Sequence, residues 1–224
     1  MWQSLVNGVA VFLGFLYELT VSMGIPSYAL AILFLTVILK IVLYPLSHKQ
    51  MSSMKKMQEI QPKVKELQEK YKKNPEKANQ EILALYKENK VNPMSGCLPL
   101  LVQMPIVIAL FQALQKFQYA DLGASFFWIP HLKDPDPLMI LPILVGLATY
   151  LQSKVTSANT DNPQAAATQR MMLYFMPILI AWMSMKFPAG LGLYWAFFSV
   201  LGALQQVLIN RQPTMQKGEV GGSK

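Results

Sequence analysis

Lys40 is the side chain with the clearest chemical potential in this sequence, because it places a positive charge inside a long apolar stretch. Residues 32–46 read ILFLTVILKIVLYPL. A lysine at the centre of a membrane-spanning helix costs roughly 2.5–3.5 kcal/mol on insertion scales. The surroundings of Lys40 must therefore make this position tolerable or useful.

Three environments would accommodate the Lys40 ammonium: the cytoplasmic interface, an internal carboxylate, or a water-filled cavity. Reaching the interface is awkward, because the end of the apolar stretch at Leu46 lies about 9 Å away along a helix. Helical side chains also lean toward their own N-terminus, which is the outer side here. A carboxylate partner is lacking, because the five apolar stretches given below contain no Asp or Glu. A water-filled cavity is the favoured environment, and snorkelling to the interface is the alternative.

Four other side chains are candidates to line this cavity with Lys40. They are Thr36, one turn earlier on the same helix face, Gln103, Tyr194 and Trp195. Each alone is typical of packing or of an interfacial anchor, whereas together they predict a polar cavity open to lipid or cytoplasm. An unpaired cation there would attract a transient anionic partner, by about 1 kcal/mol at 4 Å in water and about 4 kcal/mol at an effective dielectric of 20. Such an attraction would guide a passing segment without trapping it.

The elements that position these residues are apolar stretches, in a chain of 224 residues that is 53% hydrophobic and only 14% charged. They are residues 28–46, 96–114, 138–152, 171–185 and 190–209. Each is long enough, or nearly so, to cross a hydrocarbon core of about 30 Å. Interior prolines in several of them favour bent helices around a cavity, and kinks that serve packing alone are the alternative. The sequence therefore predicts an all-α membrane protein with five transmembrane helices.

The distribution of basic residues predicts how these spans are oriented. Residues 48–91 hold eleven bases, the loop 153–170 holds two and the tail 210–224 holds three. The opposite side, made of the loop 115–137 and Lys186, holds three. The N-terminus is therefore predicted outside and the C-terminus in the cytoplasm.

The N-terminal segment, residues 1–22, is predicted to form an additional helix. It has Trp2 near one end and a partly polar stripe at helical spacing, made of Gln3, Asn7, Gly14 and Glu18. This pattern favours an interfacial helix that lies along the membrane. A short extra span is the alternative.

Apolar residues spaced three and four apart predict a cytoplasmic two-helix hairpin in residues 48–91. The stripe is Met57, Ile60, Val64, Leu67 and Tyr71 before the turn KKNP at residues 72–75, and Ala78, Ile82 and Leu85 after it. Pro62 either starts the first long helix or kinks it. Eleven bases against six acids leave this hairpin at +5. That charge is typical of a solvated positive-inside segment, or of a docking arm for anionic headgroups, ribosomal RNA or a targeting factor.

The side chains needed for an enzyme are not brought together by this sequence. His48 and His131 fall on opposite sides of the membrane in the predicted topology, and no hydrolase, zinc-protease or phosphate-loop motif occurs. A proton-coupled transporter would need a carboxylate within the spans. We therefore expect no catalytic residues, no metal and no cofactor, in a protein that is not an enzyme.

Five blocks of this sequence resemble the YidC/Oxa/Alb family of membrane protein insertases. The blocks are LKIVLYPLSHKQ (39–50), MQEIQPKVKELQEKY (57–71), ALYKENKVNPMSGCLPLLVQMPIVIALF (84–111), FFWIPHLKDPDPLMILPIL (126–144) and FPAGLGLYW (187–195). The similarity extends over nearly all of residues 28–211, and the third and fifth blocks are specific to this family. It is the set of blocks that carries the resemblance.

The resemblance implies five spans that enclose a hydrophilic groove, closed on the outer side, with an external interfacial helix and a cytoplasmic hairpin that receives substrates. Lys40 stands where the family usually has arginine. Lysine keeps the positive charge but lacks the planar bidentate fork of a guanidinium. Thr36, Gln103, Tyr194 and Trp195 match other groove positions. The implied partners are nascent membrane proteins, the lipid bilayer, the ribosome, the signal recognition particle or its receptor, and the Sec translocon, but not DNA.

The function expected on these grounds is insertion of hydrophobic segments and short polar flanks from the cytoplasm into a bacterial cell membrane. Two alternatives remain: an anion-selective transporter or channel that uses Lys40, and an assembly factor that only holds spans together. The tail after residue 209 has three bases, too few to predict strong ribosome binding through it.

Overall fold

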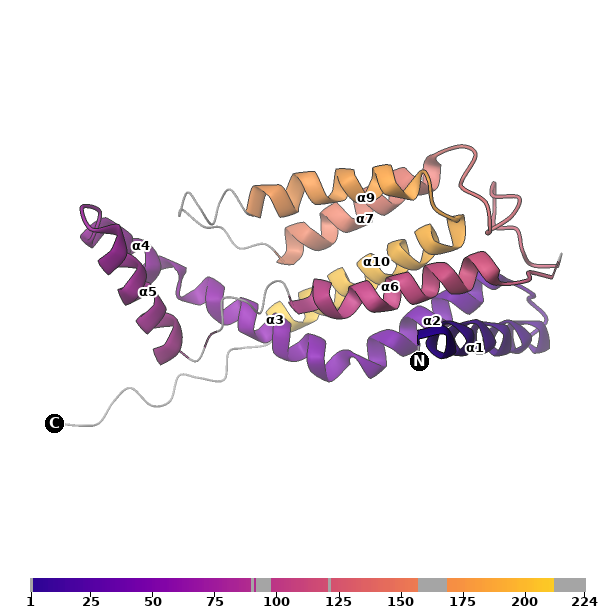
Figure 1. The fold of residues 1–224 in the computed structure, drawn as a ribbon, viewed down its shortest axis with the longest axis horizontal. Helices are drawn as coiled ribbons and strands as arrows, with labels where there is room; N and C mark the ends of the chain where they lie inside the picture. Colours follow the sequence, from indigo (N-terminus) through magenta and orange to yellow (C-terminus); the bar gives the residue numbers. More distant parts are fainter. Residues whose placement is uncertain (1, 90, 92–97, 121, 157–168, 212–224) are drawn as a thin grey trace.

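The computed structural model describes residues 2–89, 91, 98–120, 122–156 and 169–211. Within these residues the regular structure is helical, apart from one isolated β-bridge between Phe126 and Ile129. The predicted all-α class is therefore confirmed. The helices form an elongated bundle with a separate arm at one end (Figure 1).

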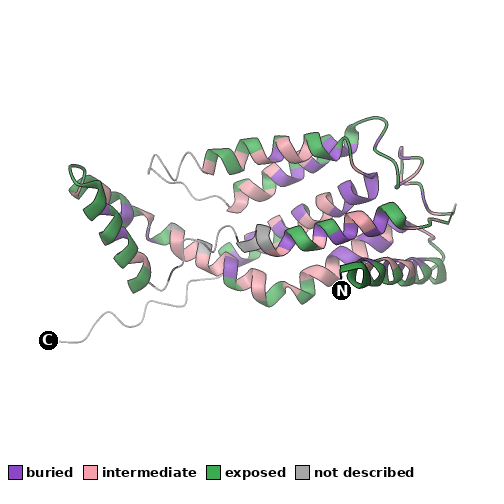
Figure 2. Cartoon of the chain, viewed as in Figure 1, coloured by how far each residue is buried: buried purple, intermediate pink, exposed green. Residues whose placement is uncertain are grey.

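The bundle is built around α10 (Ala189–Arg211), which packs against α2 (Tyr28–Val42), α6 (Leu98–Lys116), α7 (Ile140–Thr156) and α9 (Met176–Ser184). The buried residues lie mainly where these helices face one another (Figure 2). Their outward faces are apolar and exposed, as expected for helices that meet lipid. Close approach of α7 and α9 depends on Gly146, because a Cβ there would lie 3.0 Å from the Ala181 Cβ.

Length and composition alone identify α1 (Trp2–Ser22) and α10 as helices that could cross a membrane, and α2 with the start of α3 would be a third. The helical segments Ile140–Thr156 and Met171–Ser184 are apolar but shorter. The number of five spans therefore stays a prediction.

The predicted first span, residues 28–46, is not one straight helix. Helix α2 ends at Val42 and α3 (Tyr44–Glu59) follows with its axis turned by 63°. Pro45 explains the break, because its ring has no N–H to donate and clashes with the carbonyl one turn earlier. Lys40 therefore lies in the last turn of α2, just before the bend.

A second proline shapes the segment predicted as the fourth span. It begins as a π-helical turn, η2 (Met171–Phe175), in which the Met176 N–H donates to the Met171 carbonyl, and continues as α9. Pro177 follows in the first turn of α9. The wider turn accommodates a proline inside a continuous helical segment.

The N-terminal helix α1 packs on both α2 and α6. Tyr17 stacks on Tyr28 with ring centroids 3.8 Å apart, and Val6 is buried with Ala109 and Ala113 of α6. Its predicted polar residues Gln3, Asn7 and Glu18 are exposed. The predicted interfacial position of residues 1–22, and its alternative of a short extra span, therefore both stay predictions.

The arm consists of α4 (Gln61–Lys70) and α5 (Pro75–Glu88), which pack against each other and are carried away from the bundle by α3 (Figure 1). Ile60, Val64, Ala78 and Ile82 form its small buried core. Pro62 lies in the first turn of α4, so it starts that helix. Asn74 caps α5 by accepting a hydrogen bond from the Lys77 N–H at 3.1 Å.

The loop after α6 closes the opposite end of the bundle through backbone hydrogen bonds. The Tyr28 N–H donates to the Gly123 carbonyl at 3.1 Å, and the Gly190 N–H donates to the Leu132 carbonyl at 2.9 Å. Asp136 is buried and accepts hydrogen bonds from Trp128 Nε1 at 3.0 Å, from the Leu138 N–H just before α7 and from the Leu141 N–H in its first turn. This loop is therefore tied to the starts of α2, α7 and α10.

Candidate functional site

The Lys40 side chain points into the bundle, and its ammonium lies on the face of an aromatic ring. The Nζ atom is 3.5 Å from the centroid of the Phe198 ring on α10. A cation over an aromatic face is attracted by the negative ring quadrupole. The sequence-based alternatives for Lys40 did not include this contact.

Gly202 supplies the space beside the ammonium, one helical turn after Phe198. A Cβ added to Gly202 would lie 3.0 Å from Lys40 Nζ and 2.5 Å from Nε2 of Gln152 on α7. The charge therefore sits where α2, α7 and α10 meet. Among the residues that the structure describes, no carboxylate forms an ion pair with Lys40.

Two of the predicted groove residues contact each other. Gln103 on α6 donates from Nε2 to the Tyr194 hydroxyl on α10 at 2.6 Å, and both side chains are buried. The Tyr194 ring in turn lies 5.8 Å from the Phe198 ring, centroid to centroid. The structure therefore connects Gln103 and Tyr194 to Lys40 through Phe198.

The other two predicted residues occupy different places. Thr36 is fully buried and its hydroxyl donates to the Ile32 carbonyl of its own helix at 2.6 Å. Trp195 is half-buried and packs against the apolar core. Neither side chain is hydrogen-bonded to Lys40 within the described part of the chain.

Sequence reasoning missed Phe198, Gly202 and Gln152. A signal for the first two was present, because Tyr194, Phe198, Gly202 and Gln206 recur every four residues and so lie along one face of α10. Gln152 had no comparable signal, since a glutamine near the end of an apolar stretch is common at the membrane interface.

Polar side chains continue along this interior beyond Lys40. Thr149 Oγ1 and Ser199 Oγ are 3.5 Å apart between α7 and α10. Further along α10, Gln205 Nε2 and Gln206 Oε1 are buried and have no hydrogen-bond partner among the described residues. Buried amide atoms of this kind are usually satisfied by ordered water.

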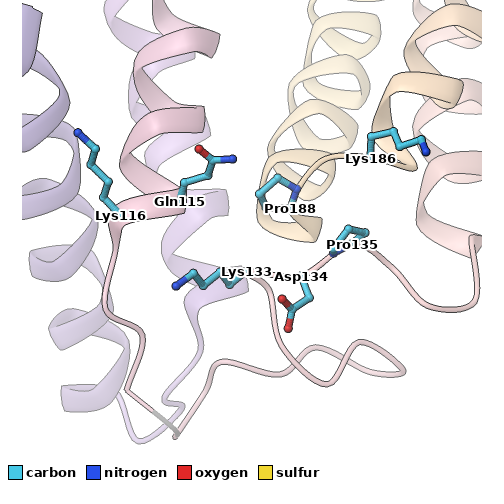
Figure 3. A pocket seen from close by; sticks show the side chains of 7 residues that line it. All are labelled: Gln115, Lys116, Lys133, Asp134, Pro135, Lys186 and Pro188. Carbon is cyan, nitrogen blue, oxygen red and sulfur yellow. The ribbon is translucent and has the colours of Figure 1, made fainter.

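Two surface hollows lie away from these residues. One, of about 490 Å³, is at the loop end of the bundle and is lined by Gln115, Lys116, Lys133, Asp134, Pro135, Lys186 and Pro188 (Figure 3). Its lining therefore includes Lys116, Lys133 and Lys186, the three lysines predicted for the outer side. The second, of about 350 Å³, is apolar and lies between α1, α2 and α6. Neither is lined by Lys40, Thr36, Gln103, Tyr194 or Trp195.

Comparison with known proteins gives a consistent result over most of the chain. The profile of the family described as "60Kd inner membrane protein" matches residues 19–217. Proteins named membrane protein insertase YidC are similar: that of Geotalea daltonii is 44% identical over 83% of this chain and 34% of its own length. That of Clostridium perfringens is 42% identical over 86% of this chain and 82% of its own length.

A solved structure is also similar, and it is described as an active YidC insertase with its first transmembrane domain resolved. It is 28% identical and superposes with a TM-score of 0.68 over 95% of this chain and 47% of its own length. The chain spans about a third of the length of several of its relatives, including that of Geotalea daltonii.

Proposed function

Because the chain belongs to the 60Kd inner membrane protein family, we propose that it is a membrane protein insertase. The resemblance to the YidC/Oxa/Alb insertases is thereby confirmed, and the chain is a helical membrane protein of the bacterial type. Its proposed work is to move hydrophobic segments and their short polar flanks from the cytoplasm into the bilayer, without nucleotide hydrolysis.

The observation that carries this proposal is the unpaired charge of Lys40 inside the bundle. A fixed internal carboxylate would neutralise the ammonium, whereas Phe198 leaves its full charge available to an acidic flank. The unpartnered amide atoms of Gln205 and Gln206 support a water-containing groove on the same side of α10. Thr36, Gln103, Tyr194 and Trp195 are the other proposed groove residues.

In the proposed mechanism the α4–α5 hairpin receives a hydrophobic segment from the cytoplasm. The groove accepts its polar flank, and the segment then slides past α2 and α10 into lipid. Burial of its apolar surface, at about 25 cal/mol per Å², and the membrane potential acting on acidic flanks would supply the driving force. The net charge of +5 over residues 48–91 supports contacts with the ribosome and with the signal recognition particle or its receptor. The Sec translocon is a further proposed partner.

The test is insertion of a small protein with an acidic translocated tail into vesicles that contain Lys40→Arg, Lys40→Leu or Lys40→Glu protein. We expect Arg to retain most of the activity, and Leu and Glu to lose roughly ten-fold or more, because an opposite charge at close range is worth several kcal/mol in a partly buried site. Equal insertion by all variants would refute the role of Lys40. Anion flux through substrate-free vesicles, abolished in Lys40→Leu, would favour the channel alternative instead.

We further propose that the hairpin and the C-terminus are cytoplasmic and that the loop 115–137 is outside. Cysteines introduced one at a time on each side of the membrane can test this orientation if they are accessible to a reagent. Ala84 in the hairpin and Ser125 in the loop are exposed and therefore suitable, whereas Ala78 and Ala124 in the same segments are buried. In a Cys97→Ser background, an impermeant thiol reagent added outside cells should modify Ser125→Cys and leave Ala84→Cys unmodified. The reverse pattern would overturn this orientation.

A further inference from the structure

We propose that Phe198 and Gly202 form a seat for the Lys40 ammonium and so determine where the positive charge lies inside the bundle. This inference rests on the proposed function, because the position of the charge matters for an insertase that guides acidic flanks. Both are positioning residues in this proposal: neither needs to touch a substrate.

Phe198 supplies the attraction that holds the charge. Its ring centroid is 3.5 Å from Lys40 Nζ. The centroid of this ring is 5.8 Å from that of Tyr194, which is 1% exposed and accepts a hydrogen bond from Gln103 across the bundle. Because this hydrogen bond restrains Tyr194, Tyr194 in turn limits how far the neighbouring Phe198 ring can move away from the ammonium.

Gly202 supplies the space. A methyl group on this residue would lie 3.0 Å from Lys40 Nζ, and 2.5 Å and 3.1 Å from the Nε2 and Cδ atoms of Gln152. The atoms that would have to move are the far ends of two flexible side chains rather than backbone. Gly202→Ala should therefore displace the ammonium while it leaves the helices in place.

A seat of this kind suits a charge that must be held and then released. A cation–π contact favours the seated position by a factor of roughly five to thirty. An acidic flank offers a full negative charge and can therefore compete with the ring. A carboxylate at position 198 would instead retain the ammonium.

The seat can be observed directly in the full-length protein in detergent micelles, with lysine labelled at Cε. The Cε protons of a lysine seated on an aromatic face are shifted upfield by the ring current, and the resonance of Lys40 is assigned by its disappearance in Lys40→Arg. We expect the upfield shift to be lost in Phe198→Leu, reduced in Gly202→Ala and kept in Phe198→Tyr, since tyrosine also binds cations on its face. Phe197→Leu, the same change on the neighbouring residue, is the matched control and should keep the shift.

A second measurement tests how strongly the seat holds the Lys40 amine. It is the rate at which a small, membrane-permeable, amine-reactive reagent modifies Lys40 in vesicles, divided by the rate for the exposed Lys133. Phe198→Leu should raise this rate roughly five-fold, which corresponds to the loss of about 1 kcal/mol of cation–π attraction. If Phe198→Leu kept the ring-current shift of the unmodified protein, or if its modification rate at Lys40 were unchanged, the proposed seat would be refuted.

The insertion assay separates this inference from the proposed function. Phe198→Leu and Gly202→Ala should slow insertion of the acidic-tailed substrate several-fold and leave a substrate with a neutral tail unaffected. Normal insertion of the acidic tail by both variants would overturn the positioning role. Normal insertion by Lys40→Leu would instead refute the role of Lys40 in the proposed function, and the spectroscopic seat would stand.

Discussion

Removing the hydrogen bond between Gln103 and Tyr194 tests whether this pair ties α6 to α10. The donor–acceptor distance is 2.6 Å, and the two side chains are 9% and 1% exposed. Neither the Gln103 side chain nor the Tyr194 hydroxyl has another hydrogen-bond partner among the described residues. Tyr194→Phe would therefore leave a buried amide unpaired, and Gln103→Leu would leave a buried hydroxyl unpaired.

The magnitude follows from where the bond lies. An unpaired buried polar group costs about 1–3 kcal/mol in soluble proteins, but interhelical bonds in membranes average about 0.6 kcal/mol and reach about 1.7 kcal/mol. This bond is short and buried, so we expect about 1 kcal/mol for each single variant. The double variant, with no unpaired group, should lose about 1 kcal/mol less than the sum of the two.

The assay is equilibrium unfolding in mixed micelles with increasing SDS, followed by the fluorescence of Trp195 and the other tryptophans. The matched control is Gln112→Leu, the same change on the same helix, at a residue whose bond to Trp2 is exposed. It should change the free energy of unfolding by less than about 0.5 kcal/mol. Additive effects of Gln103→Leu and Tyr194→Phe, within about 0.3–0.5 kcal/mol, would refute the reasoning.

Three other outcomes are expected outside the groove. Asp136→Ala should destabilise the protein by about 3 kcal/mol or more, because a buried carboxylate that accepts three hydrogen bonds is lost, whereas the exposed Asp134→Ala should be nearly neutral in the same SDS titration. Burial raises the pKa of the Tyr119 hydroxyl above its usual value near 10. Its neutral form therefore contributes full stability below about pH 10 and loses that contribution as the pH rises further, so Tyr119→Phe should flatten the alkaline end of a plot of unfolding midpoint against pH. Gly146→Leu should separate α7 from α9 and lower the unfolding midpoint, and an unchanged midpoint would contradict the tight contact with Ala181.

Much of the fold was accessible from the sequence because it depends on local chemistry. The three- and four-residue spacing around Val64 and Ile82 predicted the hairpin, and the apolar stretches predicted the bundle helices. The break after α2 was missed although Pro45 was visible, because the predicted stretch was defined by hydropathy alone. Hydropathy measures transfer to lipid and carries no information about the backbone direction.

The site was predicted only in part. Lys40, Gln103 and Tyr194 stood out as polar groups in apolar surroundings. Phe198 did not, because an aromatic residue in an apolar helix is typical of packing. Gly202 and Gln152 acquire their importance only from the distance between helices that are far apart in the chain, which a single sequence does not contain.

The loop after α6 has a mechanical consequence for the whole bundle. It joins the starts of α2 and α10 through backbone hydrogen bonds, and Tyr17 adds a bond from α1 to the Leu122 carbonyl. The helices α1, α2 and α10 are thus held together by hydrogen bonds at the loop end of the bundle. Any separation of α2 from α10 is therefore expected to be smallest at the loop and to increase toward the arm. A small rotation of one helix about its loop end would move the two helices furthest apart at the opposite end, where Lys40 lies.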